Sequence, residues 1–274
     1  GLRTAFIGKV GNDMHGKFLI EAVENQNINS DGIILDDNVF TTLAFVNLTK
    51  DGERSFAFAR KPGADTMIGY KEVDTQILQN TKVFHVGSLS LTDEPARSTT
   101  FQAVKCAKNA GAVISYDPNY RAPLWNNEKT AIERMRSMLP FADMIKLSDE
   151  ETALLTPYEN PDEAANYLLD HGIKIVAVTL GKEGVLICNR KDHQKVSGFS
   201  SQVVDTTGAG DSFWGGFMSQ FVKSKLNPED CSIEELKKFA RYGNAVASLC
   251  IEKKGGILSI PEEKETFKRL QLSV

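Results

Sequence analysis

Two glycines and an aspartate form the most chemically informative stretch of the sequence. They lie in residues 204–217, VDTTGAGDSFWGGF, which predict the end of a strand, a glycine-rich turn and then a helix. Gly208 and Gly210 let the backbone turn sharply and approach a ligand without a Cβ in between. The helix that follows presents unpaired N–H groups and the positive end of its dipole. The stretch therefore predicts an anion hole suited to a phosphate group.

Asp211 stands at the mouth of this predicted anion hole. An aspartate side chain in water is ionised at neutral pH, so it would not attract a phosphate by charge. It can instead accept the proton of a hydroxyl that attacks the phosphorus atom, while backbone N–H groups stabilise the charge on the transferred group. For GxGD alone, a structural interpretation is about as good: Asp211 would be a helix N-cap and the glycines a tight turn.

Short apolar runs alternate with amphipathic helical patterns along the chain. Strands are predicted at residues 4–8, 83–86, 112–116, 144–147 and 175–180. Helices are predicted at residues 14–25, 95–109, 128–139, 161–171, 211–223 and 231–251. The predicted strands do not alternate strictly between polar and apolar side chains, as expected when both faces of a sheet are covered. The pattern predicts an α/β fold with a mostly parallel central sheet and helices on both faces.

One region interrupts this alternation. Residues 40–48 are rich in β-forming types, Asp51-Gly52 predicts a turn, and residues 54–60 alternate polar and apolar side chains. Together they predict a β-hairpin. Local sequence alone leaves two interpretations open, a lid over a site or a peripheral hairpin that extends the sheet.

The longer string DTTGAGD resembles the C-terminal signature of the ribokinase-like (PfkB-type) carbohydrate kinases. The resemblance covers essentially the whole chain and is closest to bacterial fructokinases. TAFIGKVGNDMHG is similar to the family's second strand and loop, TTLAFVNLTKDGERSFAF to its lid hairpin, and YDPNYRAPLW to the fructokinase DxNxR segment. KLSDEE, VTLGKEGV and KKGGILSIP follow in the family's order. The resemblance implies a three-layer ribokinase-like fold, with residues 1–274 as a single kinase domain and residues 33–61 as its small β lid.

The resemblance also implies roles around the anion hole. Asp211 matches the family's catalytic base, in contact with the substrate hydroxyl. The anion hole itself matches Gly208, Ala209 and Gly210. Beyond these glycines, the positions that match ATP contacts are Thr179, Gly181 and Asn244, the last in the adenine pocket.

Two kinds of metal ion are implied in the same way. Glu151 matches the acidic member of the family's NxxE motif, which organises Mg²⁺ and its water shell. Ser148 replaces the asparagine of that motif, so only the role of Glu151 is carried over. Many family members also bind a monovalent cation, and backbone carbonyls would suit K⁺ here. The matching positions are Asp205, Thr207, Cys250, Lys253, Gly255 and Ser259. The implied cofactors are thus ATP and Mg²⁺, with K⁺ as a further expectation.

Two arginines are candidates for contacting the substrate. Arg121 lies in the DxNxR segment, and the N–H donors of its planar guanidinium group suit binding to a sugar or a phosphoryl group. The alternative is that Arg121 forms a surface salt bridge. Arg60, at the end of the hairpin, is the second candidate, with a merely solvated side chain as its alternative.

The amino-acid composition argues against several other classes of protein. The 274 residues carry a formal net charge of −4 without a concentrated basic run, which argues against binding to nucleic acid or a membrane surface. The four cysteines are far apart and form neither a CxxC pair nor a zinc motif, which is typical of reduced thiols in a cytoplasmic protein. No apolar run approaches the length of a membrane span.

The family pattern begins earlier than this sequence does. Family members carry an N-terminal segment with the first strand, an aspartate that holds the sugar and a Gly-Gly motif, and no residue before Gly1 supplies them. We expect the sequence to be a fragment of a longer chain rather than a protein that lacks part of its sugar site. A homodimer formed through the lid is a further expectation from the resemblance.

The sequence thus predicts ATP-dependent phosphorylation of a small sugar, with fructose as the first acceptor. One alternative keeps the chemistry and changes the acceptor to ribose, 2-keto-3-deoxygluconate or a nucleoside. Another is a non-catalytic relative that binds a nucleotide or sugar. A Rossmann-type dehydrogenase fits poorly, because the opening GKVGND has only part of a GxGxxG spacing.

Overall fold

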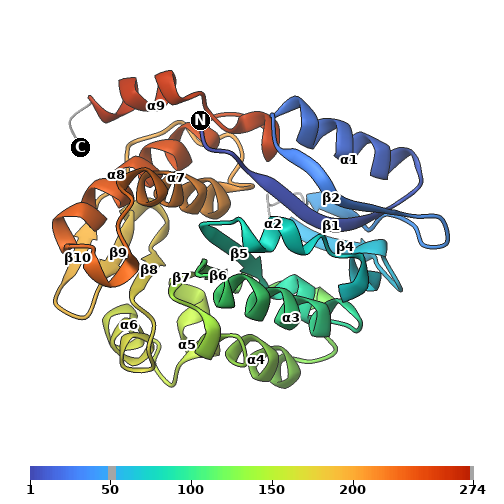
Figure 1. Ribbon diagram of the computed structural model, residues 1–274. Helices are drawn as coiled ribbons and strands as arrows, with labels where there is room; N and C mark the ends of the chain where they lie inside the picture. Colours follow the sequence, from blue (N-terminus) through green and yellow to red (C-terminus); the bar gives the residue numbers. More distant parts are fainter. Residues whose placement is uncertain (49–53, 272–274) are drawn as a thin grey trace. The chain divides into compact units, whose positions relative to one another are not determined.

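The computed structural model describes residues 1–48 and 54–271, with colours that follow the sequence in Figure 1. The chain forms two compact units, Gly1–Phe141 and Ala142–Val274. In both units helices alternate with strands, and strands separated by a helix pair in parallel. The predicted α/β class is therefore confirmed.

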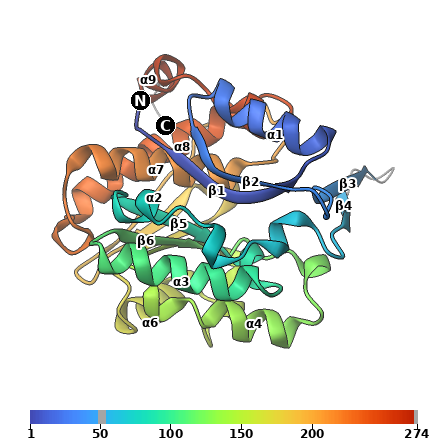
Figure 2. The same cartoon turned by 45° about the vertical axis from the view of Figure 1, so that its right-hand side comes forward.

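The first unit opens with a parallel strand–helix–strand motif. Strand β1 (Ala5–Gly11) pairs in parallel with β2 (Asn29–Asp36), and helix α1 (Met14–Asn25) connects them. The helix lies along this strand pair (Figure 2). The helix has the predicted bounds, because Asp13 caps it by accepting from the N–H groups of His15 and Gly16. Strand β2 was not predicted.

The predicted hairpin is present. Strand β3 (Leu43–Leu48) pairs antiparallel with β4 (Arg54–Ala59). The predicted turn at Asp51-Gly52 lies outside the described residues. The segment expected to form the lid, residues 33–61, begins inside β2, so the hairpin itself occupies only its later part.

A second parallel motif completes the first unit. Strand β5 (Val83–Gly87) pairs with β6 (Val113–Asp117), and α3 (Ala96–Asn109) packs against both. Helix α4 (Glu128–Arg136) then ends three residues before the predicted position. A shorter helix, α2 (Thr75–Gln79), packs on α3.

The described residues of the second unit, 142–271, contain four strands. Strands β7 (Met144–Ser148) and β8 (Ile175–Thr179) are parallel, and β9 (Val185–Cys188) and β10 (His193–Val196) extend them in antiparallel fashion. The first four residues of β7 and of β8 are all buried, as predicted for strands covered on both faces.

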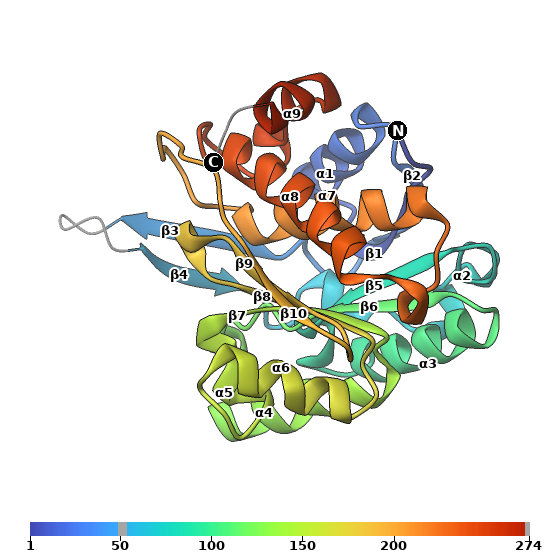
Figure 3. The same cartoon turned by 90° about the vertical axis from the view of Figure 1, so that its left-hand side faces the viewer.

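Helices cover both faces of this second unit (Figure 3). Helix α6 (Pro161–Asp170) packs on β8 and β9, and α8 (Ile233–Cys250) packs on β9 and β10. Helix α7 (Ala209–Ser224) lies beside α8. The remaining helices are α5 (Thr152–Leu155) and α9 (Glu263–Leu270). The unit thus has three layers, with helices above and below the strands.

Candidate active site

The glycine-rich turn ends where α7 begins. Gly208 is the N-cap residue, and its φ of 78° lies in the left-handed region that favours glycine. The N–H of Ala209 donates to the Thr206 carbonyl at 3.2 Å, and the N–H of Ser212 donates to the Gly208 carbonyl at 2.8 Å. The helix therefore starts two residues before the predicted position, and Asp211 is the third residue of its first turn.

The N-terminus of α7 carries no side-chain cap. Asp13 caps α1 and Ser232 caps α8 with side-chain oxygens, whereas α7 has no such hydrogen bond. N–H groups in the first turn of a helix have no acceptor within the helix, so they can bind an anion. The alternative interpretation of Asp211 as the N-cap is wrong, because Gly208 occupies that position. Asp211 itself is exposed.

A buried lysine lies beside this helix end, and the sequence analysis missed it. Lys146, in the middle of β7, is 5 % exposed. Its Nζ lies 2.8 Å from the point that a Cβ on Gly210 would occupy. The available signal was a charged residue within a strand predicted to be covered on both faces, where lysine is rare.

The three predicted ATP contacts occupy different elements of the second unit. Thr179 is the last residue of β8, and its Oγ1 donates to the Leu147 carbonyl at 3.3 Å. Gly181 follows with an exposed backbone and a φ of 56°. Asn244 is buried in α8, where its Nδ2 donates to the carbonyls of Val196 and Ser197, both at 3.0 Å. Asn244 thus joins α8 to the end of β10, and its place in an adenine pocket stays a prediction.

All six positions predicted for a monovalent cation are linked by hydrogen bonds. The Asp205 carboxylate accepts from the N–H groups of Thr207 at 2.9 Å and Gly255 at 3.3 Å. The Cys250 thiol is buried 3.0 Å from Ser259 Oγ and 3.9 Å from the Thr207 carbonyl oxygen. The Lys253 N–H donates to the Cys250 carbonyl at 3.2 Å, and the Lys253 side chain forms an ion pair with Glu265 at 3.5 Å.

Among the described residues, no group of three or more histidine, cysteine, aspartate or glutamate side chains is placed to hold a metal ion. The K⁺ site implied by the resemblance would use backbone carbonyl oxygens instead. The ion itself stays a prediction.

Glu151 lies just after β7 and is 8 % exposed. Its Oε2 accepts from the Ser148 N–H at 2.8 Å and from the Ser148 hydroxyl at 3.1 Å. Ser148 thus positions the carboxylate through the hydroxyl that replaces the family's asparagine. A single carboxylate fits Mg²⁺, which proteins often hold through one or two carboxylates, substrate phosphates and water.

The two candidate arginines belong to the first unit and differ in how they are held. Arg121 follows β6, is half-buried, and its Nη1 donates to the Tyr120 carbonyl at 2.9 Å. The side chain of Arg60 is 5 % exposed and forms an ion pair with Asp65 at 2.5 Å. Its guanidinium also donates to Thr92 Oγ1 and to the Leu89 carbonyl, both at 2.8 Å. These bonds favour a structural role for Arg60, and its substrate contact stays a prediction.

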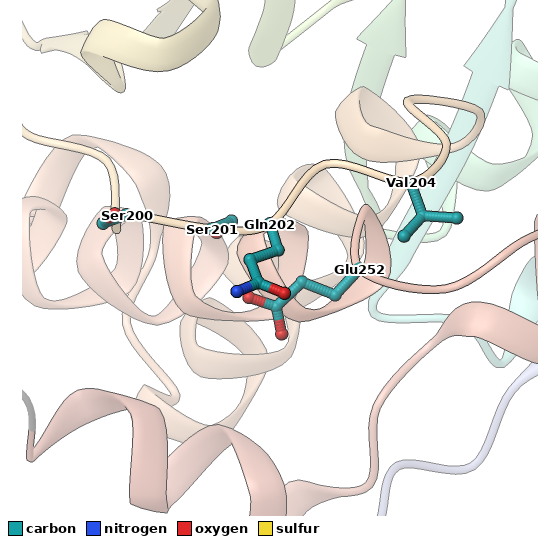
Figure 4. A pocket seen from close by; sticks show the side chains of 5 residues that line it. All are labelled: Ser200, Ser201, Gln202, Val204 and Glu252. Atoms are coloured by element: carbon teal, nitrogen blue, oxygen red, sulfur yellow. The ribbon is translucent and has the colours of Figure 1, made fainter.

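A hollow of about 500 Å³ lies elsewhere on the second unit (Figure 4). Four of its lining residues come from the extended segment before the glycine-rich turn, and Glu252 faces them from just beyond α8. Glu252 forms an ion pair with Arg269 at 2.8 Å. None of the predicted site residues lines this hollow, so we do not assign it to the chemistry.

An uncapped helix end, a preceding left-handed glycine and an exposed aspartate in the first turn are the features that the sequence predicts for a phosphoryl-transfer site. The sequence model of the pfkB family carbohydrate kinases matches residues 1–263. The chain therefore belongs to the pfkB family of carbohydrate kinases.

The similar proteins are largely fructokinases. A probable fructokinase-2 of Arabidopsis thaliana is 40 % identical over 277 residues, which cover 100 % of this chain and 83 % of that protein. Fructokinase-2 of Solanum lycopersicum is 39 % identical over 272 residues, covering 99 % of this chain and 82 % of that protein.

The similar solved structures are also fructokinases. The fructokinase of Vibrio cholerae O395 with fructose, ADP and calcium ion has a TM-score of 0.89 at 29 % identity, covering 98 % of this chain and 86 % of that one. The fructokinase of Xylella fastidiosa with bound ATP has a TM-score of 0.90 at 30 % identity, covering 97 % and 84 %. The predicted ribokinase-like fold is therefore confirmed.

Proposed function

We propose that this protein transfers the terminal phosphoryl group of ATP to a hydroxyl group of fructose. The uncapped N-terminus of α7 with Asp211 in its first turn carries this proposal, because the open end of the helix would serve as the anion hole and Asp211 as the base. The choice of fructose rests on fructokinases that are about 40 % identical to nearly the whole chain.

The mechanism follows from these groups. Asp211 accepts the proton of the attacking sugar hydroxyl, whose oxygen then forms a bond to the terminal phosphorus atom of ATP. The bond from that phosphorus to the bridging oxygen of ADP breaks, and ADP leaves. Backbone N–H groups of the first turn of α7 stabilise the charge on the transferred group, together with the helix dipole.

The other site residues take positions around this step. Gly208, Ala209 and Gly210 form the anion hole, and Thr179, Gly181 and Asn244 contact the nucleotide. Glu151 would hold Mg²⁺ through its water shell, and the bound ion would neutralise charge on the phosphates. The loop from Asp205 to Thr207, with the segment from Cys250 to Ser259, would bind K⁺.

The remaining expectations also belong to this proposal. Arg121 would contact the sugar or the transferred group, and the β3–β4 hairpin would act as a lid and as the interface of a homodimer. The described residues include no helix long and apolar enough to cross a membrane. All four cysteine thiols are free, which is consistent with the proposed cytoplasmic location.

The test is ADP release by the full-length gene product with Mg·ATP and a panel of acceptors. Fructose should give the highest kcat/KM, above ribose, 2-keto-3-deoxygluconate and nucleosides. If another acceptor gave the highest kcat/KM, the proposed phosphoryl transfer would stand, but fructose would be the wrong substrate. Measurable ATP binding without ADP release for every acceptor would contradict the proposal and favour a non-catalytic relative.

A further inference from the structure

We propose that Arg269, on the last turn of α9, is a positioning residue that holds the segment leading into the glycine-rich turn, and thereby the N–H groups at the start of α7. This inference rests on the proposed phosphoryl transfer and adds to it a residue outside the predicted site. Arg269 acts through its neighbours, by fixing the backbone that would bind the transferred group. The sequence predicted no helix at residues 263–270, so this connection was not expected.

The segment before the turn depends on hydrogen bonds for its position. Residues 197–208, all within the described part of the chain, lie between β10 and α7 and belong to neither a helix nor a strand. None of these residues is buried, and Val203 and Val204 are 61 % and 52 % exposed. Apolar packing therefore holds the segment only weakly, and polar contacts have a large share in fixing it.

The guanidinium of Arg269 connects this segment to the end of α8. Nη1 donates to the Ser200 carbonyl at 3.3 Å, to Ser201 Oγ at 3.4 Å and to Ser248 Oγ at 3.1 Å. Nη2 donates to Glu252 Oε2 at 2.8 Å, which is a charge-assisted ion pair. The Arg269 side chain is only 11 % exposed, so water competes little for these bonds. The planar guanidinium keeps its donors in fixed directions, so it can hold several acceptors in one arrangement.

The backbone extends this restraint toward the turn. Further along the segment, the N–H groups of Val204 and Asp205 both donate to the Ile251 carbonyl, at 2.8 and 3.1 Å. Ile251 directly precedes Glu252, the ion-pair partner of Arg269. Arg269 thus binds the two stretches of chain that meet at Ile251, and Figure 4 shows Glu252 beside the segment.

Asp205 connects the segment to the glycine-rich turn. Its carboxylate accepts from the N–H groups of Thr207 and Gly255, at 2.9 and 3.3 Å. Gly208 follows Thr207 as the N-cap of α7. A shift of the segment would therefore move the first N–H groups of α7, which would bind the transferred phosphoryl group. Misplacement of a reacting group by about 1 Å can lower a reaction rate by about 10²-fold.

The first experiment compares Arg269→Met with Glu263→Gln in ADP release with fructose. Each change removes an ion pair of α9, since Glu263, the first residue of that helix, pairs with Lys223 at 2.6 Å. Arg269→Met should lower kcat by about 10–100-fold and change KM for fructose less than about threefold, because the turn moves while the sugar contacts remain. Arg269→Lys keeps the charge and should recover part of kcat.

Glu263→Gln is the matched control and should keep kcat within about twofold of the unaltered protein, because Glu263 does not bind the segment. An equal loss of kcat in Glu263→Gln would overturn the inference, since any weakening of α9 would then have this effect. A kcat of Arg269→Met within twofold of the unaltered protein would overturn it as well.

Hydrogen exchange gives a readout that a loss of overall stability would not reproduce. In Arg269→Met, exchange of the Val204 and Thr207 N–H groups should become at least about fivefold faster, while exchange in β7 and β8 stays the same. Unfolding of the whole unit would instead accelerate exchange in all of these residues. Unchanged exchange at Val204 and Thr207, or equal acceleration throughout the unit, would overturn the inference.

A second variant keeps the test valid if Arg269→Met does not fold. Glu252→Gln keeps the size of the side chain but removes the charge that holds the guanidinium. It should accelerate exchange at Val204 and Thr207 by about threefold and lower kcat by a similar factor. If it changes neither quantity, the inference is overturned.

Failure of the proposed function has a different signature. The unaltered protein would then release no ADP with any acceptor, whereas hydrogen exchange would still show whether Arg269 fixes the turn.

Discussion

Gly210 has no side chain, and the space that a Cβ would fill lies 2.8 Å from Lys146 Nζ. The flexible end of the Lys146 side chain could move away from such a Cβ. Gly208 is the more constrained glycine of the motif, since its backbone has a φ of 78°, in the left-handed region. Asp211, the residue after Gly210, carries the proposed proton transfer.

Asp211→Asn tests that role most directly. The amide keeps the shape of the carboxylate but cannot accept the hydroxyl proton, so kcat should fall by about 10²–10⁴-fold. Affinity for ADP should be unchanged, because the backbone N–H groups remain. Steady-state ADP release and calorimetric binding measure the two quantities. A variant that kept near-normal kcat would exclude Asp211 as the base.

At the scale of elements, the N-termini of the helices differ in whether a side chain accepts hydrogen bonds from their first N–H groups. Helix α7 has no side-chain cap, whereas the Asp13 side chain caps α1. The Asp13 carboxylate accepts from the N–H groups of His15 and Gly16 and, across to the next segment, from the N–H and hydroxyl of Thr41. These bonds, chiefly that from the Thr41 N–H, lower the pKa of Asp13 to about 2.

Asp13→Ala should therefore destabilise the protein by about 1–2 kcal/mol at pH 7. The folded pKa lies below the ordinary aspartate value of about 3.9, so this stabilisation is present above that pH and is lost as pH falls toward 2. Urea unfolding at pH 7 and pH 3 measures the difference, which should be smaller at pH 3.

Asp74→Ala is the matched control. Asp74 caps α2 by accepting from the N–H of Gln76 at 2.8 Å, so its loss should cost less than that of Asp13. Equal costs for the two variants, or a difference for Asp13→Ala that does not change with pH, would contradict this explanation.

At the scale of the whole molecule, the four cysteine thiols differ in their exposure to solvent. Cys188, Cys231 and Cys250 are buried, whereas Cys106 is half-buried on α3. Burial raises the pKa of Cys231 to about 12 and raises that of Cys188 further. Because the thiolate is the reactive form, the buried thiols should be inert in the folded protein.

A disulfide reagent at pH 8 should thus modify Cys106 first, and all four cysteines only after denaturation. Peptide mapping by mass spectrometry identifies the modified residue, and Cys106→Ser should remove the fast phase. Rapid modification of Cys188 in the folded protein would show that the second unit opens far more readily than its packing indicates.

Local sequence predicted the elements whose signals are local. Helix α1 has its predicted bounds because Asp13 caps it, and β7 and β8 follow apolar runs. Strand β2 was missed because only three of its residues, 33–35, form an apolar run; its pairing with β1 stabilises it instead. The start of α7 was placed two residues late because a glycine-rich run has weak helix propensity.

The sequence by itself determined the α/β class and the glycine-rich motif with Asp211. Both depend on residue types at short spacing. The periodicity of apolar residues indicates the helices and strands, and the backbone freedom of glycine indicates the sharp turn. Tertiary structure alone decided that Lys146 lies against Gly210, that Cys250 meets Ser259, and that the guanidinium of Arg60 is bound to Asp65 and Thr92. The contacts of Lys146 with Gly210 and of Arg60 with Thr92 join residues far apart in the chain, and packing, rather than local propensity, brings such residues together.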